Sequence, residues 1–124
     1  MIRFPTFLVV GATALALTAC SPKAEPVPVG PADLNVVGVD IKFDQTAYTA
    51  SAGEVSIKLE NRGNQTHNLL IKQGDKKGAR IGGKVVTGPG ATKTGTYTLA
   101  AGTYYVYCDI AGHEASMNST LTVS

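Results

Sequence analysis

The sequence predicts an all-β domain, a β-sandwich or barrel, over most of its length. Apolar and polar residues alternate in several short segments, which turns one face of each segment toward a core. Breaks that contain glycine separate these segments at regular intervals, and runs rich in Thr, Tyr and Val lie between the breaks. Beyond residue 20, no stretch of useful length has the 3.6-residue period of an amphipathic helix.

The predicted strands begin at residue 34. In the first, an alternating set of apolar residues is expected to face the core: Val37, Val39, Ile41 and Phe43. In the second, Val55, Ile57 and Leu59 alternate with polar residues in the same way. Another strand is expected to open at His67, and further β-rich runs cover residues 93–99, 103–108 and 119–123.

Residues 73–84 form the least regular part of the predicted domain. The stretch contains four basic residues, Lys76, Lys77, Arg80 and Lys84. Basic residues without an apolar period are typical of a solvated loop, which is the expectation here. A docking surface for an acidic partner is the alternative.

The N-terminus has the pattern of an export signal. Arg3 supplies a positive start, and an apolar run follows over residues 6–17. This run is shorter than the roughly 20 residues that span a bilayer, and it fits the hydrophobic part of a secretory signal. It ends in Leu-Thr-Ala-Cys at residues 17–20, which resembles the bacterial lipobox. We therefore expect a lipoprotein signal peptide over 1–19 and a lipidated Cys20. Ordinary signal cleavage and an uncleaved anchor are the alternatives.

Residues 20–33 are expected to be a tether between the lipid and the domain. Four prolines in residues 21–31 favour an extended chain and prevent a helix. Residues 34–124 would then form a single domain with a modest core. This organisation predicts an extracytoplasmic protein, periplasmic or on the outer face of a membrane, held there by its lipid.

The charge gives no support for nucleic-acid binding, and the cysteine count argues against an intrachain disulfide. The formal net charge of +2 offers no strongly basic face for nucleic acid. The chain has two cysteines, so lipidation of Cys20 would leave no partner for an intrachain disulfide. Sheet packing and a bound metal must then stabilise the domain.

After residue 20, the chain has one cysteine, two histidines and one methionine, and all four are candidate metal ligands: Cys108, His113, Met117 and His67. Soft sulfur and nitrogen donors select copper, and two histidines, a cysteine and a weak axial methionine form the blue-copper arrangement. Taken singly, such residues are more often a core cysteine, a gap-filling methionine or a solvated histidine. Zinc is the other metal that favours Cys and His, but a thioether is a poor zinc ligand.

The residues around these ligands resemble the cupredoxins. Asn68 follows His67, an early strand ends in Asn-Arg-Gly at 61–63, and Gly-Thr-Tyr at 102–104 leads into Cys108. The Cys-x4-His-x3-Met spacing is similar to the azurin-like members. The resemblance covers residues 34–124. It implies a Greek-key sandwich or barrel of about seven to eight strands and one type 1 copper ion that cycles between Cu(I) and Cu(II).

The resemblance also implies roles for two neighbours of the ligands. The backbone N–H of Asn68 would donate to the sulfur of Cys108, and its side chain would bind the segment around Asp109. These bonds would tune the thiolate and join the two ligand loops. An ordinary turn residue is the alternative for Asn68.

The implied function is one-electron transfer by a monomeric carrier rather than catalysis. Its partners would be redox proteins such as a cytochrome, an oxidase or a copper reductase. A copper enzyme needs further histidines for a second centre, and a dinuclear site needs two cysteines in the binding loop; neither is present. The alternative is a protein of the cell envelope that binds and delivers copper, although Met-rich or His-rich tracts are absent.

Overall fold

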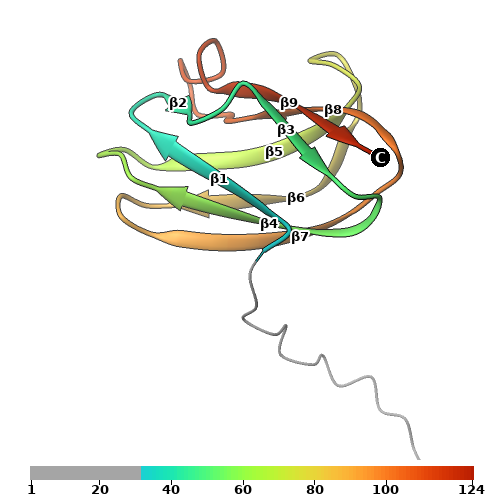
Figure 1. The fold of residues 1–124 in the computed structure, drawn as a ribbon. Coiled ribbons are helices and arrows are strands. Elements are labelled where there is room, and N and C mark those ends of the chain that lie inside the picture. Colours follow the sequence, from blue (N-terminus) through green and yellow to red (C-terminus); the bar gives the residue numbers. More distant parts are fainter. Residues whose placement is uncertain (1–31) are drawn as a thin grey trace, which may run out of the picture.

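The computed structural model describes residues 32–124, which form two β-sheets packed face to face (Figure 1). The strands of this part of the chain are β1 (Leu34–Val39), β2 (Lys42–Phe43), β3 (Ala47–Ala50), β4 (Gly53–Asn61), β5 (His67–Gln73), β6 (Arg80–Thr87), β7 (Thr92–Leu99), β8 (Gly102–Tyr107) and β9 (Asn118–Val123). No helix within these residues is long and apolar enough to cross a bilayer. The expected signal peptide, Cys20 and most of the tether lie outside the described residues.

The all-β prediction is confirmed. One sheet has the strand order β2-β1-β4-β7, and the other has the order β3-β9-β8-β5-β6. The chain crosses from one sheet to the other several times, as in Greek-key sandwiches. Nine strands are present in the described part, against the seven to eight expected, and one of them is only two residues long.

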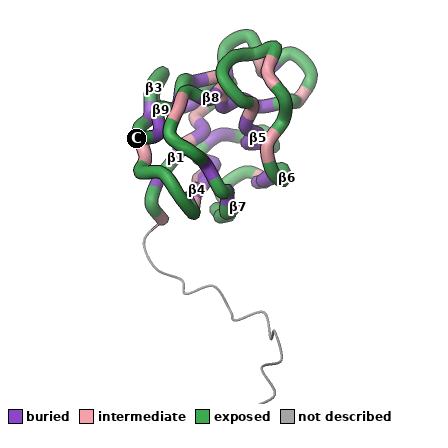
Figure 2. Tube along the Cα trace, turned by 90° about the vertical axis from the view of Figure 1, so that its right-hand side faces the viewer, coloured by how far each residue is buried: buried purple, intermediate pink, exposed green. Residues whose placement is uncertain are grey.

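The core lies between the two sheets, and Figure 2 marks in purple the buried residues of the strands that contribute to it. In β4 the alternation predicted from sequence is confirmed, since Val55, Ile57 and Leu59 are all buried. On β8, Tyr104 and Val106 also belong to the buried core. These strands bury apolar side chains on one side, which is the main favourable contribution to folding.

The prediction for the first strand was wrong in its register. Leu34 and Val36 face the core, whereas Val37 and Val39 are only half-buried. The strand ends at Val39, and a turn at residues 40–41 leaves Ile41 exposed before Phe43 enters the core. Because a turn interrupts the two-residue period, the parity before it does not carry over to the residue after it.

The prediction of a loop over 73–84 was correct only for its first half. Strand β6 begins at Arg80 and pairs with β5. The pairing contains a bulge: Leu69 lies opposite Val85 and Ile71 lies opposite Ile81, so residues 82–84 face a single residue of β5. Gly82 lies in this bulge with a positive φ of 66°, a conformation that favours glycine.

Candidate metal centre

Three donor side chains meet at one end of the sandwich. His67 opens β5, Cys108 directly follows β8, and His113 lies in the loop between β8 and β9. One ligand atom from each lies within 4.8 Å of the other two. The sulfur of Cys108 is 3.8 Å from Nδ1 of His113, and the two imidazole centroids are 5.4 Å apart. Their spacing allows one metal ion to be held among them.

The loop that carries two of these donors folds back on itself. The N–H groups of His113 and Met117 donate to the carbonyls of Ile110 and His113, respectively, which forms two consecutive tight turns. Gly112 has a φ of 84°, so the chain can turn sharply just before His113. The N–H of Cys108 then donates to the carbonyl of Met117 and closes the base of the loop.

His67 is a buried imidazole without a hydrogen-bond partner. The side chain is 0% exposed, and neither Nδ1 nor Nε2 has a partner among the described residues. Burial, and to a smaller degree repulsion from His113, lowers the pKa of His67; the nearby backbone and carboxylate of Asp40 act in the opposite direction but do not outweigh them, so the ring is held neutral. An unsatisfied buried polar group costs about 1–3 kcal/mol. One nitrogen of this neutral ring can donate its lone pair to a metal ion, which would remove the cost at that nitrogen, so the residues fit a metal.

Two glycines make room for the His67 ring. A Cβ at Gly38 would lie 3.1 Å from His67 Cδ2 and 3.2 Å from Met117 Cε, and a Cβ at Gly63 would lie 3.2 Å from His67 Nε2. All three contacts are tighter than side chains ordinarily make. The same measurements place the fully buried Met117 beside His67. Larger residues at either position would displace the imidazole or the thioether.

The outer nitrogen of His113 is paired with Gln65. The distance between His113 Nε2 and Gln65 Oε1 is 3.0 Å, so the ring donates and the amide oxygen accepts. This assignment leaves the lone pair on Nδ1, which faces Cys108. The backbone carbonyl of Gln65 is held by the side chain of Asn61 at 2.7 Å. A ligand histidine is usually oriented by a bond of this kind at its other nitrogen.

A polar network surrounds the cysteine. The N–H of Asn68 donates to Cys108 Sγ at 3.3 Å, and its side-chain amide donates to Asp109 Oδ1 at 2.6 Å. These are the two contacts that the resemblance implied. Asp109 Oδ2 also pairs with Lys84 Nζ at 2.6 Å. Partial burial raises the pKa of Asp109, but its bonds to Lys84 and Asn68 outweigh burial and hold that pKa below its usual value.

The structure thus brings together every candidate residue that lies in its described part: His67, Asn68, Cys108, Asp109, His113 and Met117. Sequence reasoning missed Gly38, Gln65 and Lys84. Lys84 was expected to be solvated, but it forms an ion pair beside the site. Only the pairing of β6 with β5, which a single sequence does not reveal, carries it there.

The metal-free protein should lose stability as the pH falls from about 7 to 5. In the unfolded chain, histidine takes up a proton near pH 6.5, whereas the pKa of His67 is lower in the fold. Between the two pKa values the unfolded chain binds more protons, so the free energy of unfolding falls with the pH. Urea titrations at several pH values test this expectation. The His67→Gln variant should lose most of the dependence; an unchanged dependence would contradict the role of His67.

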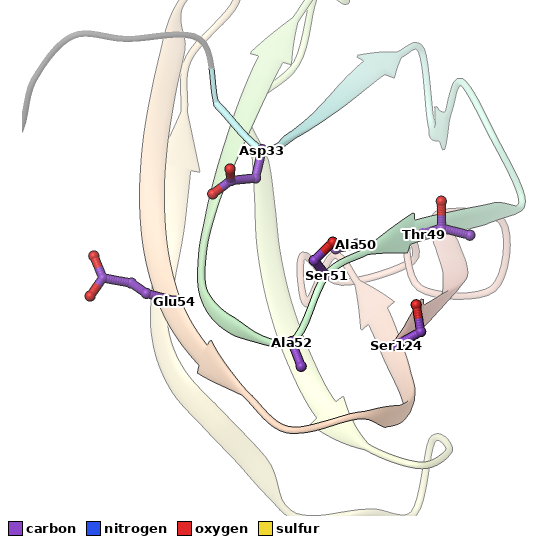
Figure 3. Close-up of a pocket in the computed structure, with 7 residues that line it drawn as sticks. All are labelled: Asp33, Thr49, Ala50, Ser51, Ala52, Glu54 and Ser124. Atoms are coloured by element: carbon purple, nitrogen blue, oxygen red, sulfur yellow. The ribbon is translucent and has the colours of Figure 1, made fainter.

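A separate hollow of about 400 Å³ lies near Asp33 and Ser124 (Figure 3). The hollow and the metal centre lie toward opposite ends of β1, because Asp33 precedes this strand and Gly38, near its other end, lies against His67. The carboxylate of Asp33 is already satisfied by the N–H and hydroxyl of Ser56. The hollow contains none of the candidate ligands, so it offers no competing metal centre.

The sequence matches no family model and no curated protein. Solved structures do match. Auracyanin A, a "blue" copper protein from the green thermophilic photosynthetic bacterium Chloroflexus aurantiacus, is 27% identical with a TM-score of 0.65; the match covers 77% of this chain and 100% of that chain. Reduced auracyanin from Roseiflexus castenholzii is 22% identical, with a TM-score of 0.64 and coverages of 77% and 99%. An azurin from Methylomonas sp. strain J is 17% identical, with a TM-score of 0.61 and coverages of 73% and 95%.

Proposed function

We propose that this chain, a cupredoxin by its fold and its cluster of donor atoms, transfers single electrons by means of one type 1 copper ion. The observation that carries the proposal is the buried His-Cys-His group, in which neither nitrogen of His67 has a hydrogen-bond partner among residues 32–124. When bound, the copper would supply the Cu(I)/Cu(II) couple. The protein would supply donors held by three segments of the sandwich, so that little has to move when the electron arrives.

Four residues would hold the copper. His67, Cys108 and His113 would be the strong ligands, and Met117 a weaker fourth one. The proposal for Met117 is supported by its complete burial and by its position beside His67 at Gly38. Because these residues come from β5, the end of β8 and the loop before β9, the metal would join three segments.

The direct test is to add Cu(II) to the purified metal-free protein and record its visible spectrum and its metal content. An intense blue or green band from sulfur-to-copper charge transfer, with one copper per chain, is the expected result. A colourless protein that retains zinc instead would contradict the proposal. Zinc has no charge-transfer band in this range, so the two metals are easily told apart.

An electron carrier is distinguished from a copper-delivery protein by how firmly it holds the ion. A carrier retains copper through repeated oxidation and reduction, whereas a delivery protein releases it to a partner or a mild chelator. The buried donors favour retention, since each ligand that the structure describes is at most 5% exposed. Loss of copper to a mild chelator within a few redox cycles would favour delivery.

Met117→Leu should keep the site coloured and raise its reduction potential. As a ligand, the thioether would donate electron density that stabilises Cu(II) more than Cu(I), so its removal would favour the reduced state. We expect a shift on the order of 59 mV, which corresponds to a tenfold change in relative affinity for the two states. Voltammetry of the two proteins measures it. An unchanged potential and spectrum would mean that Met117 only fills space in the core.

The electron is expected to enter and leave beside His113. At 5% exposed, this residue is the most accessible of the four proposed ligands, the others being 0% exposed. Around it the loop exposes small residues, Ala111, Gly112 and Ala115, and Gln65 covers its outer nitrogen. A small and mostly uncharged rim lets a redox protein approach closely, in the weak, low-area contacts typical of redox encounters. Such a partner would be a cytochrome, an oxidase or a copper reductase.

Ala115→Asp should slow electron self-exchange while leaving the visible spectrum nearly unchanged. Self-exchange requires two such rims to meet, and like charges facing each other oppose that contact. We expect a decrease of about tenfold at low ionic strength. The control is Ala101→Asp, which adds the same charge before β8, at the end of that strand away from Cys108. Equal rates in the two variants would show that the electron leaves by another face.

The protein is further proposed to act outside the cytoplasm, on a lipid anchor at Cys20. The lipobox-like residues 17–20 and the proline-rich residues 21–31 support this part of the proposal. Stable anchoring needs more than one acyl chain, because a single chain binds a membrane only marginally. Labelled fatty acid should enter the wild-type chain in bacteria and fail to enter the Cys20→Ala variant. Absence of label from the wild-type chain would rule the anchor out.

A further inference from the structure

We propose that Lys84 is a positioning residue for the candidate copper centre. It would act from outside the ligand set, through the carboxylate of Asp109, on the hydrogen bond that Asn68 donates to the cysteine sulfur. This inference rests on the proposed electron-transfer function and assigns to it a residue that lies on a different strand from every ligand.

Three short contacts connect the ammonium group to the sulfur. Lys84 Nζ lies 2.6 Å from one oxygen of Asp109, and the other oxygen accepts from the side chain of Asn68 at 2.6 Å. The backbone N–H of Asn68 then donates to Cys108 Sγ at 3.3 Å. Both oxygens of a single carboxylate are therefore held from two strands, β5 and β6. The orientation of Asn68 depends on where that carboxylate is held.

The position of Lys84 is a product of the bulge in β6. Residues 82–84 face the single residue Leu70, because the pairs on either side are Leu69 with Val85 and Ile71 with Ile81. Bulges change the direction of side chains and are frequent next to functional sites. Here the bulge lies beside the strand that begins with His67, and it places the lysine within reach of the ligand loop.

The ion pair is too exposed to contribute much to stability. The side chains of Lys84 and Asp109 are 34% and 32% exposed. Pairs of this kind contribute roughly 0–1 kcal/mol to the free energy of unfolding. Its proposed role is in the redox equilibrium, because the carboxylate belongs to the residue directly after the proposed ligand Cys108. Without the lysine, that negative charge would be unbalanced and the Asn68 bond would loosen, and both changes favour Cu(II).

Lys84→Met should therefore lower the reduction potential. The expected change is about three- to tenfold in the ratio of Cu(II) to Cu(I) affinities, or roughly 30–60 mV. The matched control is Lys93→Met on β7. Lys93 and Lys84 both line a surface groove between β6 and β7, and Lys93 forms no ion pair with another described residue. Lys84→Arg, which keeps the cation, should restore most of the potential. Equal potentials in the two methionine variants would overturn the proposal.

A double-mutant cycle distinguishes the proposed action of Lys84 through Asp109, called the relay here, from a direct electrostatic effect of the lysine charge on the copper. In the background Asp109→Asn, Lys84 has no carboxylate to hold, so Lys84→Met should change the potential at most one-third as much as it does in the wild type. An undiminished effect in that background would show that Lys84 acts only by its charge and would overturn the relay through Asp109.

A measurement on the metal-free protein keeps this inference distinct from the copper proposal. Hydrogen exchange of the Asn68 amide, followed by NMR, should be at least about threefold faster in Lys84→Met than in Lys93→Met, because its bond to Cys108 is less firmly held. Equal exchange rates would overturn the positioning role. A wild-type chain that forms no blue copper site would refute the proposed function, and the exchange rates would still decide the role of Lys84.

Discussion

Cys108→Ala is expected to abolish the visible band of the copper-loaded protein completely while the β-sandwich remains folded. The band arises from charge transfer between a thiolate and Cu(II), and Cys108 is the free cysteine of the described residues. Its side chain is 0% exposed and belongs to the core cluster, so the substitution removes a buried sulfur as well as a ligand. We expect a loss of roughly 1–2 kcal/mol in the metal-free protein, typical of a small core change.

The measurement combines visible absorption with circular dichroism. A matched control is Glu114→Gln, in the same loop, whose side chain is partly exposed and is not a proposed ligand. The control should keep the band, and both variants should keep the β-type spectrum. A charge-transfer band that survives in Cys108→Ala would remove this residue from the ligand set.

Copper should raise the midpoint of thermal unfolding by roughly 15–30 °C. A ligand at one thousand times its dissociation constant stabilises the native state by about 4.1 kcal/mol. In a domain of this size each kcal/mol moves the midpoint by about 4–8 °C. One physical source is the ring of His67, which is buried with no partner among the described residues and would donate a nitrogen lone pair to the metal. The metal would also join the loop at residues 108–117 to the start of β5.

Calorimetry of the copper-loaded and metal-free proteins tests this expectation. The loaded protein is compared with the same sample after chelation and with the Cys108→Ala variant, in which added copper should shift the midpoint by only a few degrees. Equal midpoints with and without copper would mean that the metal does not stabilise the fold. The proposal that the buried His67 ring is stabilised by binding a metal would then be wrong.

Much of this protein could be predicted without a structure, because its strongest signals are local. Alternation along β4 indicates a buried face wherever the strand lies, since successive side chains point to opposite sides. The spacing of Cys108, His113 and Met117 likewise lies within a single loop, whose turns bring the residues together. The identity of the donors limits the metal chemically, whatever the fold.

Other features depend on contacts between distant segments. The turn after Val39 separates two segments whose buried residues have opposite parity, because Val36 is buried before it and Phe43 after it. A single alternating pattern drawn through both segments therefore predicted the wrong core face for the first strand. The sequence offers His67 as the second imidazole, but only the fold places the ring against Gly38 and Gly63 and leaves its nitrogens without a hydrogen-bond partner in the described part of the chain.

The sequence alone determined the all-β class, the composition of the donor set and its soft, copper-selecting chemistry, because alternation, turn residues and ligand types are properties of the chain itself. Only the tertiary structure decided that Gln65 orients His113 and that Lys84 holds Asp109. Those contacts join residues 48 and 25 positions apart, and they depend on a bulge and on strand pairing. Strand pairing is settled by the packing of the whole sandwich, so no local pattern predicts it.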